Sequence, residues 1–179
     1  MTLKSLSDDK PIGVIGAGNF GSAVANLLAT RRRVLLFARD EMVVQQIHDQ
    51  RENRGHRMHE NVLPVNDLEQ VAESCDVIFP IVPSAHFRSM MQELSAYVHP
   101  YHILIHGTKG FDIQLPEGET IHTMKTLHRG HVKTMSEVIT EESAVVRVGC
   151  LAGPNLSREL AAGQPAATVV ASQFNEVIQ

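Results

Sequence analysis

A glycine-rich stretch near the amino terminus has the residue types and spacing of a phosphate-binding turn. Apolar residues 12–15 run into the pattern G-x-G-x-x-G, and residues 22–28 have the character of a helix. Gly16 would permit the tight turn, Gly18 would let a phosphate approach the backbone, and Gly21 would let the helix pack against the strand. Unpaired N–H groups at the start of such a helix attract anions, so we expect a dinucleotide here. Two further residues lie at the mouth of this expected site: Asn19 and Phe20.

Arg39 and Asp40 bear on which nicotinamide cofactor would bind. They follow the next expected strand, 18 and 19 positions after Gly21. An arginine here would accept the 2′-phosphate of NADPH, whereas a carboxylate would bind the ribose 2′-hydroxyl of NADH. If Arg39 faces the cofactor, Asp40 is better placed to cap the following helix. We favour NADPH, and NADH stays open.

Two later turns carry further candidate residues. Pro83 opens a helix and Phe87 lies one helical turn on, where they could cover the nicotinamide half of a cofactor. The alternative is a proline at the first helical position with ordinary core residues behind it. Lys109 lies between two glycines at the end of a strand, and could reach a phosphate or a carbonyl oxygen. A loop lysine that is simply solvated is the competing interpretation.

The histidines and cysteines do not predict a metal site. Two histidine pairs have the spacing of metal ligands: His56 with His59, and His128 with His131. A zinc site needs three or four protein ligands, and no nearby carboxylate or cysteine pair completes either set. We expect solvated histidines and no metal. The two cysteines, Cys75 and Cys150, lie in apolar surroundings and are expected to be reduced core residues.

Composition indicates one ordinary domain over residues 1–179. The sequence is 43% hydrophobic and 20% charged, with a net charge of −4, so it predicts neither a nucleic-acid surface nor a membrane span. The first nine residues lack the apolar region of a secretory signal. We therefore expect a cytoplasmic protein.

Strands and helices are expected to alternate along the chain. We expect strands at residues 12–15, 34–38, 76–82, 103–105, 148–151 and 166–171. We expect helices at residues 22–28, 42–50, 68–75, 84–94 and 135–139, with a strand-to-helix turn at 152–160. Residues 51–66 are interpreted as a polar connection closed by Pro64. Continuously apolar strands that alternate with helices indicate an α/β, Rossmann-type doubly wound, mostly parallel sheet with helices on both faces. Ligands bind such a sheet outside the carboxyl ends of its strands.

The motifs together resemble NAD(P)-dependent glycerol-3-phosphate dehydrogenase of the bacterial type. The segments that carry the resemblance are residues 16–21 (GAGNFG), 61–64 (NVLP), 82–87 (VPSAHF), 107–110 (GTKG) and 153–160 (GPNLSREL). The glycine fingerprint is shared with many dehydrogenases, whereas the last two segments are more specific. The chain looks like the amino-terminal domain of this family.

The resemblance implies an activity and roles for several residues. The family interconverts dihydroxyacetone phosphate and sn-glycerol 3-phosphate by hydride transfer with a nicotinamide cofactor, for glycerophospholipid synthesis. By resemblance, four positions match cofactor contacts: Asn19, Phe20, Arg39 and Ser157. Lys109 matches a lysine that touches both cofactor and substrate, and Gly153 and Asn155 match substrate contacts. Asn155 stands where Ser or Thr is usual, and Ser157 stands where Ala is usual.

Members of the family continue into a helical carboxyl-terminal domain that carries the proton-transfer lysine. We expect that lysine beyond Gln179, so residues 1–179 alone are expected to be inactive, and the full-length protein is expected to form a homodimer. Two alternatives stay open. One is another two-domain NADP-dependent dehydrogenase of the ketopantoate-reductase kind, and the other is a non-catalytic dinucleotide-sensing module.

Overall fold

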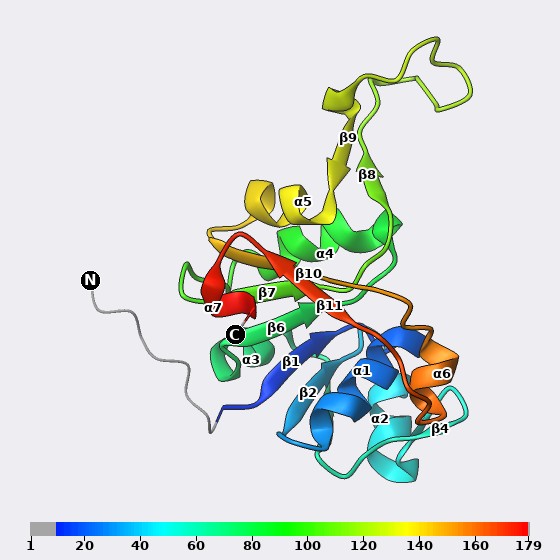
Figure 1. Cartoon of the computed structure of the whole chain (residues 1–179), viewed down its shortest axis with the longest axis vertical. Coiled ribbons are helices and arrows are strands. Elements are labelled where there is room, and N and C mark those ends of the chain that lie inside the picture. The colour runs from blue at the N-terminus through cyan, green and yellow to red at the C-terminus, as the bar shows by residue number, and fades with distance from the viewer. Residues whose placement is uncertain (1–9, 179) are drawn as a thin grey trace.

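A seven-stranded, mostly parallel sheet lies at the centre of the molecule (Figure 1). The computed structural model describes residues 10–178. The strands lie in the order β11-β10-β7-β6-β1-β2-β5. Their bounds are β1 Ile12–Ile15, β2 Val34–Phe37, β5 Val62–Val65, β6 Val77–Pro80, β7 Ile103–His106, β10 Arg147–Ala152 and β11 Val169–Ser172. The predicted Rossmann-type fold is confirmed.

Helices cover both faces of the sheet and create two hydrophobic clusters. One face carries α1 (Asn19–Ala29), α2 (Glu41–Gln50) and α7 (Asn175–Ile178), and the other carries α3 (Leu68–Ser74), α4 (Phe87–Leu94) and α5 (Met135–Glu142). All four residues of β2 are buried. Leu35 and Phe37 contribute to one cluster, whereas Val34 and Leu36 contribute to the other. Burial on both faces explains why the parallel strands are continuously apolar.

Side-chain caps fix where three of these helices begin. Asp40 accepts a hydrogen bond from the backbone N–H of Met42 at 2.9 Å, and Asp67 accepts one from Glu69 at 2.9 Å. Thr134 and Glu137 form a reciprocal capping box at the start of α5. Each cap satisfies an N–H group that the helix itself leaves unpaired. The predicted capping role of Asp67 is confirmed.

The interpretation of residues 51–66 as a polar connection is wrong. This segment contains the small hairpin β3 (Glu52–Asn53) with β4 (His56–Arg57), followed by the edge strand β5. Val62 and Val65 are buried against the sheet, and β5 pairs in parallel with β2. Pro64 does not prevent this pairing, because a proline is tolerated on an edge strand whose other side has no partner.

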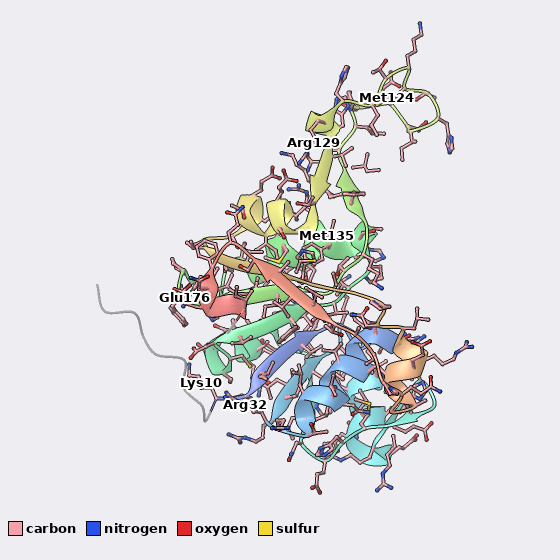
Figure 2. All side chains as sticks on the ribbon, viewed as in Figure 1. Lys10, Arg32, Met124, Arg129, Met135 and Glu176 are labelled. Carbon is pink, nitrogen blue, oxygen red and sulfur yellow. The ribbon has the colours of Figure 1, made fainter. Side chains whose placement is uncertain are left out.

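A second unpredicted hairpin projects from the body of the molecule. β8 (Phe111–Ile113) pairs in antiparallel fashion with β9 (Val132–Thr134), and the 3-10 helix η2 (Arg129–His131) precedes β9. Figure 1 shows this hairpin and its loop extending away from the sheet, and Figure 2 places Met124 and Arg129 on it. We call residues 111–134 the projecting arm.

The last strand departs from the parallel arrangement. β11 runs antiparallel to β10 at the edge of the sheet, so the connection through α6 (Ser157–Ala161) returns the chain along its neighbour. α7 then packs on β10 and β11. Among residues 10–178, no helix has the length and apolar character needed to cross a membrane.

Candidate functional site

The glycine turn between β1 and α1 has the geometry that its sequence predicts. Gly16 has φ +118°, and a Cβ atom built on it would lie 2.2 Å from the carbonyl oxygen of Ile81. A Cβ atom on Gly21 would lie 1.9 Å from the carbonyl oxygen of Gly16. Gly18 precedes the first residue of α1, and space within 4 Å of its built Cβ position is open among the described residues. Two glycines therefore permit close packing, and the third leaves room for a ligand.

The order in which strands are added to the sheet reverses beside this turn. From β1 the chain runs outward through β2 and β5, and it then returns to β6 on the other side of β1. Such a switch point leaves a crevice at the carboxyl ends of the strands. A cleft of about 370 Å³ lies there, and we call it the central cleft. It is lined by residues 18–21, 81–83, 107–109 and 155–157.

These lining segments include most of the predicted site residues. The central cleft brings together Gly18, Asn19, Phe20, Gly21, Pro83, Lys109, Asn155 and Ser157. They come from the loops and helix starts that follow four neighbouring strands, β1, β6, β7 and β10. The parallel sheet therefore gathers residues from sequence positions far apart.

Asn155 is a buried amide that faces the central cleft. Its relative exposure is 2%, yet neither its Nδ2 nor its Oδ1 has a hydrogen-bonding partner among the described residues. An unpaired buried polar group costs about 1–3 kcal/mol, so such groups need a partner. Gly153 shapes the turn that carries Asn155: it has φ +124°, and its carbonyl accepts a hydrogen bond from the Asn155 N–H at 2.9 Å. A polar ligand in the cleft would satisfy the amide.

Lys109 brings a positive charge to the central cleft. Its Nζ lies 6.0 Å from the ring centroid of Phe20, at the outer limit of a cation–π contact. The preceding residue, Thr108, donates its hydroxyl to the carbonyl oxygen of Val82 at 2.7 Å. This hydrogen bond ties the loop after β7 to the loop after β6, so the backbone that carries Lys109 is held while its side chain stays exposed.

Phe87 does not lie in the central cleft, contrary to our expectation. Its side chain is fully buried, with its ring 6.1 Å from the ring of His106 in an edge-on arrangement. The apolar face of α4 packs into the core, and Phe87 is the first residue of that face. Its position supports the competing interpretation of ordinary core packing. Pro83 precedes the short 3-10 helix η1 (Ser84–His86) and does line the cleft.

Arg39 also lies outside the central cleft. Its guanidinium is 3.5 Å from the carboxylate of Glu93, and both side chains are more than half exposed. Such an exposed pair contributes little to stability, so another anion could readily replace Glu93 beside Arg39. Asp40 caps α2, the role expected for it if Arg39 reads the cofactor. Asp40 therefore leaves Arg39 as the group at the end of β2 that could meet a phosphate.

Sequence reasoning missed two residues that hydrogen-bond to the glycine turn, Asn53 and Arg54. Asn53 is buried, and its Nδ2 donates to the carbonyl oxygen of Ala17 at 3.0 Å and to the hydroxyl of Ser22 at 2.8 Å. Arg54 also donates to the Ala17 carbonyl, from its Nε at 3.2 Å. These contacts fix the β3–β4 hairpin over the turn. Nothing in the local sequence pattern marks Asn53 or Arg54, because their partners lie more than thirty positions away.

One histidine of each pair accepts a local hydrogen bond through its ring. The ring of His59 accepts from the backbone N–H of Asn61 at 3.1 Å, and the ring of His131 accepts from that of His128 at 3.3 Å. Within residues 10–178, no group of three or more His, Cys, Asp or Glu side chains is arranged to hold a metal ion. His106 is buried beside the central cleft with its Nε2 3.0 Å from the Ser136 hydroxyl, and burial lowers its pKa.

Both cysteines are free thiols, as expected. Cys75 is fully buried, and burial raises its pKa to about 12. Cys150 is only half-buried, so the prediction of a core position is wrong for it. Burial also raises its pKa. Neither thiol is primed for nucleophilic chemistry at neutral pH, because the thiolate is the reactive form.

Comparison with known proteins identifies a family. Residues 11–178 match the family model described as NAD-dependent glycerol-3-phosphate dehydrogenase N-terminus. Glycerol-3-phosphate dehydrogenase [NAD(P)+] of Pseudomonas paraeruginosa is 35% identical over 177 residues, which cover 96% of this chain and 47% of the relative. The chain thus spans about half the length of the curated relatives it matches.

Solved structures share the fold. The glycerol-3-phosphate dehydrogenase of Coxiella burnetii aligns with a TM-score of 0.77 and 24% identity, over 95% of this chain and 49% of that one. A ketopantoate reductase from Ralstonia eutropha aligns with a TM-score of 0.56 and 14% identity, over 80% of this chain and 41% of that one. Both likenesses extend to the fold alone.

Proposed function

The chain belongs to the family of NAD-dependent glycerol-3-phosphate dehydrogenase N-terminal domains, and we propose that its central cleft binds a nicotinamide dinucleotide. The pyrophosphate lies at the start of α1, where Gly18 leaves open space and the helix presents unpaired N–H groups. Asn19 and Phe20 line the mouth of the cleft, with Pro83 and Ser157 on its other walls.

One observation carries this proposal. The buried, unpaired amide of Asn155 faces the same cleft as the open start of α1 and the exposed Lys109. An amide can donate to a phosphate or hydroxyl oxygen and accept from a hydroxyl group, and a lysine adds positive charge. The pattern suits an anionic, oxygen-rich ligand. It matches a phosphorylated hydroxy compound at the far end of the cofactor, held by Lys109, Gly153 and Asn155.

For the full-length protein we propose the interconversion of dihydroxyacetone phosphate and sn-glycerol 3-phosphate, serving glycerophospholipid synthesis in the cytoplasm. The chemistry that a bound nicotinamide dinucleotide supplies is hydride transfer. Residues of this chain hold the cofactor and place the substrate, with Lys109 stabilising negative charge on its oxygens. We assign proton transfer to a lysine of a helical carboxyl-terminal domain, and we propose a homodimer for the full-length protein. These assignments remain predictions.

Substitution of Gly18 tests the cofactor site. The 179-residue chain is expected to bind NADH or NADPH saturably, as measured by the fluorescence of the reduced nicotinamide. Gly18→Ala places a methyl group where the pyrophosphate approaches, and we expect the affinity to fall about tenfold or more, about 1.4 kcal/mol. Gly130→Ala is a matched control, because its built Cβ also meets open space, but on the projecting arm. Equal affinities for wild type and Gly18→Ala would contradict the proposed pose.

Substitution of Arg39 tests the choice of cofactor. Arg39→Asp removes a guanidinium that could pair with the 2′-phosphate and adds a carboxylate that repels it, so NADPH binding should weaken more than NADH binding. We expect a difference of about tenfold between the two losses. Glu93→Gln is the companion variant, because it frees Arg39 from its surface partner and should leave NADPH affinity equal or higher. Equal losses for both cofactors in Arg39→Asp would show that Arg39 does not read the 2′-phosphate.

The two alternative functions are less well supported. The ketopantoate-reductase alternative is not favoured, because the matching family model is a different one. The sensing-module alternative would use the same cleft without chemistry, and it predicts dinucleotide binding but no contact between a phosphorylated substrate and Lys109. Binding of dihydroxyacetone phosphate to the full-length protein separates the sensing module from the dehydrogenase. The dehydrogenase predicts binding that Lys109→Ala weakens, and the sensing module predicts none.

A further inference from the structure

The hairpin between α2 and β5 is fixed against the glycine turn from several directions. We call residues 51–58 the 51–58 hairpin. Asn53 is buried and donates to both Ala17 and Ser22 at the start of α1. Met58 is buried in the core cluster under α1 and α2, and its N–H donates to the carbonyl oxygen of Arg51 at 2.8 Å. The hairpin therefore holds a set position over the turn.

The turn of this hairpin determines the direction in which Arg54 points. Arg54 and Gly55 are its two central residues, with φ 51° and 78°, and the flanking Asn53 and His56 are paired. Two positive φ angles define the type I′ turn, in which Asn, Asp or Gly is usual at the first position. A long cationic side chain at a left-handed position costs about 1 kcal/mol or more. This conformation directs the Arg54 side chain toward the glycine turn, where its Nε contacts Ala17.

Arg54 has unused hydrogen-bonding capacity at that place. Its Nε–H donates to the Ala17 carbonyl oxygen at 3.2 Å, while the side chain is exposed. Ala17 lies between Gly16 and Gly18, directly before the open start of α1. Within residues 10–178, none of the ion pairs involves Arg54. The two terminal nitrogens of its guanidinium are thus available for an anion.

We propose that Arg54 binds a phosphate group on the adenosine half of the dinucleotide, so that the 51–58 hairpin forms one wall of the cofactor site. The inference rests on the proposed cofactor site. A guanidinium fork suits a phosphate because two parallel N–H groups can donate to two phosphate oxygens. The adenosine half of the dinucleotide offers two such sites: the pyrophosphate, and the 2′-phosphate in NADPH. Arg39 flanks the same half from the end of β2.

Titration of Arg54 variants with NADH and NADPH tests the proposal. Arg54→Ala is expected to raise the dissociation constant about tenfold or more, the usual effect of losing a hydrogen-bonded charge. Arg54→Lys should recover part of the affinity, because it keeps the charge and loses the fork. Added salt should weaken binding by wild type more than binding by Arg54→Ala, a difference that a purely structural role would not produce. Equal losses for both cofactors identify the pyrophosphate, and a larger loss for NADPH identifies the 2′-phosphate.

Arg57→Ala provides the matched control. Arg57 is an exposed arginine of the same hairpin, and its backbone carbonyl oxygen accepts from the side chain of Asn26 at 2.8 Å. Its substitution should leave both affinities unchanged. The thermal midpoint of unfolding should fall by no more than about 4 °C in Arg54→Ala, because the exposed side chain loses a single hydrogen bond to Ala17. If wild type binds and Arg54→Ala binds equally well, the Arg54 proposal is overturned alone; if wild type binds neither cofactor, the proposed function itself fails.

Discussion

Gly21→Ala is expected to destabilise the fold by about 3 kcal/mol or more. A Cβ atom on Gly21 would lie 1.9 Å from the carbonyl oxygen of Gly16 and 3.1 Å from its carbonyl carbon. Those atoms are backbone, so no side-chain rotation can relieve the overlap. Helix α1 would have to move away from β1 and β2, and the buried residues on its inner face, Ala25 among them, would lose packing. The effect should exceed that of most single substitutions.

Urea unfolding of Gly21→Ala and Gly18→Ala makes the comparison direct. The two variants add the same methyl group three positions apart in one turn. Gly18 has a φ of −75° and open space at its Cβ position, so Gly18→Ala should keep wild-type stability within about 0.5 kcal/mol. The Gly18 variant should lose cofactor affinity and the Gly21 variant should lose stability. Similar unfolding free energies for the two variants would refute the packing role of Gly21.

Much of this site could be predicted because its determinants are local. The glycine pattern, a strand before it and a helix after it specify the turn with no information from elsewhere in the chain. The loops that carry Lys109 and Asn155 could be expected at the same edge of the sheet, because parallel strands place all their carboxyl ends together. The gathering of these residues in one cleft follows from topology.

The parts that sequence reasoning missed depend on contacts between distant segments. β5 contains a proline and only two buried residues, so its local pattern is weak, and pairing with β2 decides its structure. Phe87 occupies a position compatible with cofactor or core, and the apolar face of α4 decides for the core. Arg54 gains its interest only from a carbonyl group 37 positions earlier in the chain. Tertiary contacts override local propensity at each of these places.

Arg88→Ala is expected to have the second large effect, because Arg88 joins three elements outside the cofactor cleft. From α4, its Nε donates to Asp112 of β8 at 2.8 Å, and its terminal nitrogens donate to Glu141 at 2.8 Å and to Glu142, both on α5. Its side chain is 18% exposed. Burial alone would lower the pKa of Arg88, but the carboxylates together raise it, so its charge is permanent. The pairs attach the base of the projecting arm to the body.

Removing this guanidinium leaves the carboxylates of Asp112 and Glu142 without their cation, whereas Glu141 keeps its pair with Lys133. We expect Arg88→Ala to cost about 2–3 kcal/mol at neutral pH, below the range for a fully buried pair because the cluster is partly solvated. Arg129→Ala is the matched control. Arg129 lies on the projecting arm and pairs with Glu137 of α5 at 2.6 Å, but its side chain is 68% exposed, so its loss should cost about 1 kcal/mol or less. Equal losses of stability for the two variants would contradict the role of Arg88 in joining α4, β8 and α5.

The pH dependence of the stability lost in Arg88→Ala provides a second test of this role of Arg88. Hydrogen bonds from Lys133 and Arg88 lower the pKa of Glu141 below its ordinary value of 4.5. A carboxyl group whose pKa is lowered by folding stabilises the folded state above its ordinary pKa, and this contribution disappears as the pH falls through the lowered value. Protonation also relieves the repulsion among the carboxylates of Arg88→Ala. The stability difference between wild type and variant, measured by urea unfolding, should therefore be largest at neutral pH and shrink below the ordinary carboxyl range. A difference independent of pH would mean that Arg88 acts through the packing of its aliphatic stem, because that contribution does not titrate.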